Sequence, residues 1–106
     1  MSIGHLEAVW VDDTEGVAFA TLVSLSGLDD AVVRGLVEAG ALAPLDPAAD
    51  NWRFERRSLA VARAAGRLHR AFALEADGLA LAWGLLERIH DLESEVRSLQ
   101  RLRSRD

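Results

Sequence analysis

The sequence predicts a mainly α fold, a winged helix-turn-helix with a short β-hairpin wing and a long C-terminal helix. Residues 25–42, LSGLDDAVVRGLVEAGAL, place a capped amphipathic helix between two glycines. Two prolines and a W-x-F segment then interrupt the helical pattern, and a heptad pattern fills the end of the chain. The chain has 106 residues, of which 50% are hydrophobic, so a single domain is expected over residues 1–106.

Residues 1–16 are predicted to form an N-terminal extension with a strand and a turn. Val9 and Val11 alternate with their neighbours as in a strand, and Gly16 can supply the positive φ of a tight turn. Nothing later in the chain is an obvious pairing partner for this strand.

Residues 17–57 are predicted to form the helix-turn-helix and its wing. A short helix reaches from about Ala20 to Ser26, and Gly27 tolerates the left-handed conformation of a sharp turn. Asp29 is a good N-cap for the second helix, and Gly40 ends that helix as a C′ glycine.

The wing is predicted from the segment ALAPLDPAADNWRFERR. Pro44 and Pro47 forbid a helix, and Trp52 and Phe54 alternate as in a strand. We therefore expect two strands, one leaving the second helix at Leu42 and one returning through Trp52 and Phe54.

Two further helices follow. The third segment, residues 58–76, contains a helix from about Arg56 to Phe72, whose apolar stripe includes Phe72 at its end. The ALEADG stretch breaks this helix, and Asp77 can cap the last one, which occupies the segment 77–105 and reaches from Gly78 to about Arg103.

The last helix carries a heptad seam, in which Ile89 and Val96 are a positions and Leu85, Leu92 and Leu99 are d positions. The helix is longer than so small a core can cover, which favours a homodimer. The alternative is an amphipathic helix that covers only its own domain.

The charge is divided unequally between the two halves. Residues 1–50 hold one arginine against nine acidic residues, whereas residues 51–106 hold eleven arginines against eight acids. An acidic first half repels phosphate backbones and attracts basic protein surfaces. The second helix belongs to this acidic half, so it is a poor DNA reader and a good candidate for binding a basic protein.

Catalytic and metal-binding signatures are missing from the sequence. The chain has no cysteine and no lysine, which excludes thiolate metal sites, Walker loops and Schiff bases. The histidines are far apart and lack metal-ligand spacing. We therefore expect no enzyme, no cofactor and no metal. The sequence shows no signal peptide, so a cytoplasmic location is expected.

The stretch SGLDDAVVRGLVEAGALAP resembles the winged helix-turn-helix of MerR-type regulators, in which a glycine turn precedes a capped helix and a glycine-x-leucine-x-proline end. Farther along, the W-x-F segment, the Arg67-Leu68 helix end, the break before Gly78 and the pattern from Leu85 to Glu95 resemble CbpM-type chaperone modulators. The resemblance covers about residues 17–105. It implies a protein that binds the J-domain of a DnaJ-like co-chaperone (CbpA type) and stops its stimulation of Hsp70.

This resemblance and the acidic charge together predict a docking face on the second helix. J-domains present a basic helix to Hsp70, and an acidic face could occupy it. We expect the face to contain Asp29, Asp30, Val33, Arg34 and Glu38. Capping is an equal alternative for Asp29, and the core is the better alternative for Val33.

Two other functions remain open. A DNA-binding regulator of MerR type would bind DNA phosphates through Arg53, Arg56 and Arg57 around the wing. A small-molecule sensor would line a pocket with His69, Phe72 and Trp83, although Trp83 is better explained as core. The polarity of the dimer is also open, since isoleucine and valine at a with leucine at d favour parallel helices, whereas the MerR resemblance favours antiparallel ones.

Overall fold

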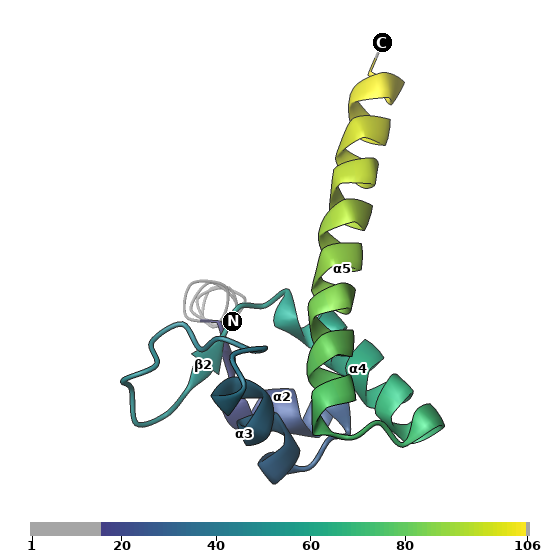
Figure 1. Ribbon diagram of the computed structural model, residues 1–106. Helices are drawn as coiled ribbons and strands as arrows, with labels where there is room; N and C mark the ends of the chain where they lie inside the picture. Colours follow the sequence, from purple (N-terminus) through teal and green to yellow (C-terminus); the bar gives the residue numbers. More distant parts are fainter. Residues whose placement is uncertain (1–15, 106) are drawn as a thin grey trace, which may run out of the picture.

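The computed structural model describes residues 16–105. In chain order its elements are β1 (Val17–Ala18), α2 (Phe19–Ser26), α3 (Asp30–Glu38), β2 (Arg53–Phe54), α4 (Ser58–Phe72) and α5 (Ala76–Ser104). The first elements gather around the beginning of α5, whose C-terminal half projects away from them (Figure 1). This arrangement confirms the predicted mainly α fold. The predicted strand around Val9 and Val11 lies outside the described residues.

The core lies where α4 packs against both α2 and α5. Leu22 of α2, Ala62 of α4 and Trp83 of α5 are completely buried there, and Phe54 of β2 closes the side toward the wing. Burial of Trp83 agrees with its interpretation as a core residue. The second helix, α3, packs on α2 and on the start of α5.

The turn between α2 and α3 forms as predicted. Gly27 has a φ of 75°, in the left-handed region, and its amide donates to the Val23 carbonyl over 3.2 Å. The Ser26 hydroxyl accepts from the Leu28 amide and donates to the Val23 carbonyl, at 3.0 and 2.9 Å. Gly66 of α4 lies directly against the Ser26 carbonyl, so α4 approaches this turn closely.

The predicted capping carboxylates do not cap. Asp29 does occupy the N-cap position of α3, and its carbonyl accepts from the Val33 amide at 3.1 Å, but its carboxylate makes no capping hydrogen bond. Helix α5 begins before the predicted start, so Glu75 is its N-cap and Asp77 lies in its first turn. The Asp29 carboxylate is consequently available to a partner.

The predicted wing has a different strand partner. β2 pairs in antiparallel fashion with β1, with Val17 opposite Phe54 and Ala18 opposite Arg53. The segment after Leu42 forms no strand, although the Leu45 amide donates to the Arg53 carbonyl at 2.8 Å. Two prolines, which cannot donate a backbone hydrogen bond, restrict that segment, whereas Val17 and Ala18 have no such restriction.

Helix α4 ends at an exposed corner of the molecule. Phe72, predicted on the apolar stripe of α4, is 68% exposed, because Ala73 ends the helix with a φ of 50° and turns the chain toward α5 at this corner.

Helix α5 has 29 residues. Within residues 16–105, no helix combines the length and apolarity that crossing a membrane requires.

Candidate functional site: the exposed faces of α3 and α5

Helix α3 presents a charged face to solvent. Its apolar side chains Val33 and Leu36 are only 1% and 3% exposed and belong to the core. Asp29, Asp30 and Glu38 are exposed around the same helix. The prediction of Val33 as a partner-binding anchor is therefore wrong, since its side chain points inward. The surface of α3 offers three carboxylates and one guanidinium.

Arg34, the cation of this face, is held by three neighbours. Its Nε donates to the Asp30 carboxylate one turn earlier, at 2.7 Å. Its guanidinium lies over the Phe19 ring, 4.7 Å from the ring centre, and 5.7 Å from the centre of the Trp52 ring. These contacts neutralise Asp30 locally and leave Asp29 and Glu38 as the less compensated acids.

The aromatic support beneath Arg34 was not foreseen from the sequence. Phe19, Trp52 and Phe54 contact one another with ring centres 6.0 to 6.4 Å apart. The Phe19 amide also donates to the Trp52 carbonyl at 3.1 Å. The sequence contains the W-x-F spacing, but nothing in it relates this segment to Phe19, more than thirty positions earlier.

An apolar groove of about 280 Å³ runs beside α3, between this helix and the corner that joins α4 to α5. The Nδ1 atom of His69, which lines this groove, is buried and has no hydrogen-bond partner among residues 16–105. Sequence reasoning missed this groove, because its two sides are about 40 positions apart. Its lining residues include Val32, Gly35 and Leu36 on one side and His69, Leu74, Asp77 and Leu79 on the other.

The arginines near the wing are engaged within the protein. Arg53 donates through Nη2 to the Gly16 carbonyl at 2.9 Å. Arg57 donates to the carboxylates of Glu55 at 3.4 Å and Asp91 at 2.6 Å. Partial burial opposes the charge of Arg57, but the nearby carboxylates outweigh it and raise its pKa.

Arg53 and Arg57 are thus partly committed to internal contacts, which disfavours them as phosphate ligands. Arg56, the third predicted phosphate ligand, is exposed. Phe72 and Trp83 do not line the groove that contains His69, so the structure does not bring together the three residues of the predicted sensor pocket.

The predicted seam of α5 is an exposed apolar stripe. Its five residues are 48 to 63% exposed, namely Leu85, Ile89, Leu92, Val96 and Leu99. Leu81 and Leu102 extend the stripe and are 67% and 58% exposed; the sequence prediction omitted them. The other described elements do not cover this face, because α5 passes beyond them (Figure 1).

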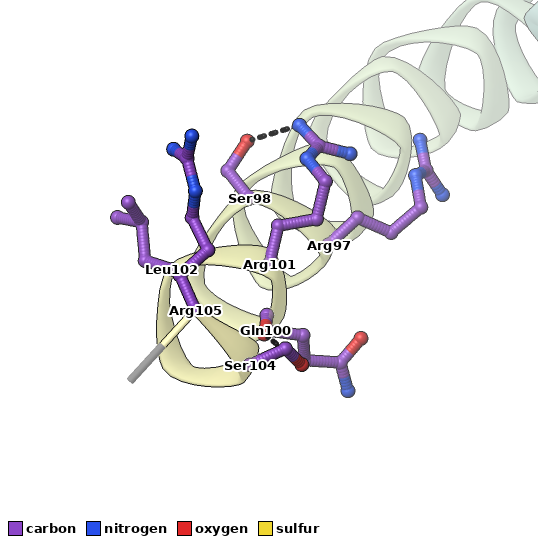
Figure 2. Close-up of a pocket in the computed structure, with 7 residues that line it drawn as sticks. All are labelled: Arg97, Ser98, Gln100, Arg101, Leu102, Ser104 and Arg105. Carbon is purple, nitrogen blue, oxygen red and sulfur yellow. Dashed lines mark hydrogen bonds between the residues drawn. The ribbon is translucent and has the colours of Figure 1, made fainter.

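The end of α5 is basic. Figure 2 shows Arg97, Arg101 and Arg105 around the last turns, and Arg101 donates to the Ser98 hydroxyl at 3.3 Å. Ser104 donates to the Gln100 carbonyl at 2.9 Å. This basic tip contrasts with the acids Asp91, Glu93 and Glu95 in the preceding turns.

Comparison with known proteins agrees with the fold. The sequence pattern of the MerR HTH family of regulatory proteins matches residues 17–101. A chaperone modulatory protein CbpM from Pseudomonas putida (strain W619) is 35% identical over 65 residues, which are 61% of this chain and 64% of the relative.

Two further relatives carry the same name, chaperone modulatory protein CbpM. The one from Pseudomonas putida (strain GB-1) is 34% identical over 71 residues, 67% of this chain and 69% of the relative. The one from Salmonella arizonae is 32% identical over 74 residues, 70% of this chain and 73% of the relative. The chain therefore belongs to the MerR helix-turn-helix family and, within it, to the CbpM group of chaperone modulatory proteins.

Proposed function

We propose that this chain is a chaperone modulator that binds the J-domain of a DnaJ-like co-chaperone (CbpA type) and inhibits its stimulation of Hsp70. The observation that carries this proposal is the charge of the exposed α3 face, where a DNA reader would carry basic residues. The name of the relatives, chaperone modulatory protein CbpM, supports a role in chaperone regulation.

The mechanism is occlusion. Asp29, Asp30 and Glu38 attract a basic helix of the J-domain, and the helix that they hold is no longer free to contact Hsp70. Arg34 limits the charge of the face and gives it an asymmetric pattern, which selects the orientation of the partner. This mechanism requires no covalent chemistry.

We further propose that the functional unit is a homodimer joined along α5. The exposed seam around Leu92 is long and apolar. A second copy can bury it with little loss of conformational entropy, because the helix is already formed. Each dimer would then carry two docking faces.

The charges favour antiparallel pairing, against the parallel preference of isoleucine and valine at a with leucine at d. With Ile89 opposite Leu92 of the partner, Leu85 meets Val96 and the small Ala82 meets Leu99. In this register the basic tip lies against the partner's less basic early turns. Parallel pairing instead places Arg103, at an a position, against its own copy and brings the two basic tips together.

Introduced cysteines can test the polarity, since the native chain has none. In an antiparallel dimer, a mixture of Leu85→Cys and Val96→Cys chains forms a mixed disulfide under mild oxidation. In a parallel dimer, Val96→Cys alone crosslinks to itself, because a residues face each other. Efficient self-crosslinking of Val96→Cys would refute the antiparallel arrangement.

Calorimetric titration with the J-domain of a DnaJ-like co-chaperone from the same organism tests the docking proposal. We expect saturable binding that weakens with salt, and loss of Hsp70 ATPase stimulation over the same concentrations. Asp30→Arg with Glu38→Arg should weaken binding by about tenfold or more. Duplex DNA serves as the parallel ligand, and binding to DNA without binding to the J-domain would instead favour a regulator of MerR type.

The matched control is Asp46→Arg with Asp50→Arg, in the exposed segment before β2. Both double variants change the formal net charge from −5 to −1, so they differ in the place of the change and not in its size. Equal weakening by both variants would mean that overall charge attracts the J-domain and that α3 is not the docking face.

A further inference from the structure

The groove beside α3 has a composition that the acidic face alone does not explain. Its walls are mainly apolar, with Val32 and Leu36 on the α3 side and Leu74 and Leu79 on the other. Its volume of about 280 Å³ is large enough for one bulky side chain and too small for a helix. A partner that docks on α3 therefore meets an open apolar hole at the edge of the charged face.

We propose that this groove receives one bulky apolar side chain from the basic amphipathic helix that docks on α3. The proposal rests on the proposed function and deepens it, because it adds an anchor pocket, lined by α3 and by the α4–α5 corner, to the electrostatic contact. Anchor side chains that fill such pockets carry most of the binding energy in protein interfaces, whereas exposed charges mainly steer and orient.

Charge complementarity identifies the occupant. Glu38 lies two turns after Ala31, a lining residue of α3, so its carboxylate extends from the same side of the helix. Asp77 lines the opposite wall. Among the described residues, neither carboxylate takes part in an ion pair. An apolar hole with carboxylates on both sides fits a helix that carries lysines or arginines one turn from a bulky apolar residue.

Gly35 provides the test. It lines the groove, and a Cβ atom added to it would meet nothing within 4 Å. A side chain at position 35 therefore starts in open space beside the groove, and we expect Gly35→Leu to fill part of the groove from the α3 side. Gly84→Leu on α5 is the matched control, since its added Cβ also meets nothing within 4 Å and it does not line the groove. Ala39→Leu, on the same wall, repeats the test independently.

We expect Gly35→Leu and Ala39→Leu to raise the Kd for the J-domain by about tenfold or more, as loss of an anchor contact does. Gly84→Leu should leave the Kd unchanged, and circular dichroism should show all three variants folded. Wild-type binding that neither Gly35→Leu nor Ala39→Leu weakens would overturn the groove proposal and leave the acidic docking face standing. No binding by the wild-type chain would overturn the proposed function and the groove together.

Two other occupants have their own signatures. If a second copy of this chain fills the groove, Gly35→Leu changes the sedimentation mass of the free protein. If a small apolar molecule fills it, native mass spectrometry of the wild-type protein shows an adduct that Gly35→Leu lacks. Either result would overturn the assignment of the groove to the partner helix.

Discussion

The guanidinium of Arg34 lies 4.7 Å from the centre of the Phe19 ring, so the charged face of α3 is attached to the first residue of α2. Trp52 contacts the same cation from the segment before β2. The contact fixes one side of α3 against the aromatic cluster while the opposite side borders the groove. The contacts of Arg34 with Phe19 and Trp52 therefore help to hold the helix that carries the docking face in place.

Replacing Arg34 tests this support. We expect Arg34→Met to lower the free energy of unfolding by about 1 kcal/mol, because the cation–π contacts and the exposed ion pair with Asp30 are each modest. Urea denaturation followed by circular dichroism measures the change. The control is Arg63→Met, an exposed arginine of α4. An equal loss in the control would mean that the aromatic contacts contribute nothing specific.

Gly66→Ala should be strongly destabilising. The added methyl group would meet the backbone carbonyl of Ser26, which cannot rotate away, so α4 must shift from the turn. We expect a loss of about 2 kcal/mol or more in the free energy of unfolding. Gly84→Ala, whose added Cβ meets nothing within 4 Å, should instead gain up to about 1 kcal/mol from helix propensity. Equal effects at both positions in thermal unfolding would contradict the close approach.

Two substitutions of Trp83 distinguish the contribution of its side-chain volume to stability from that of its indole nitrogen. Its side chain is fully buried, and its indole Nε1 has no hydrogen-bond partner among the described residues. Trp83→Ala should cost about 3 to 5 kcal/mol, because it leaves a large cavity. Trp83→Phe should cost much less, since it keeps most of the packing and loses no hydrogen bond to residues 16–105. A cost for Trp83→Phe as large as that for Trp83→Ala, measured by urea denaturation, would reveal an essential role for the indole nitrogen.

Leu92→Arg tests the proposed dimer. Leu92 lies in the middle of the seam and is 48% exposed in the single chain, so a charge there costs the monomer little. In the dimer it would be buried without a partner charge, and we expect sedimentation to show a monomer at concentrations where the wild-type chain is dimeric. Ser98→Arg, exposed and outside the seam, should remain dimeric. A monomeric wild-type chain would contradict the proposal.

Much of the fold could be predicted from the sequence, because it depends on neighbours in the chain. The left-handed turn at Gly27 follows from the freedom of glycine, and the stripe from Leu85 to Leu99 follows from the heptad spacing. The acidic character of α3 was also readable, since adjacent turns of one helix carry its charges.

Other features depended on contacts between distant segments, which only the tertiary structure decided. The sequence could not show that β2 pairs with Val17–Ala18, because backbone pairing depends on which strand is close in space. It could not show that Arg57 meets Asp91, 34 positions later, or that His69 faces α3 across a groove. Local propensity and periodicity determine the elements and their faces, whereas packing determines which faces meet and which remain open to a partner.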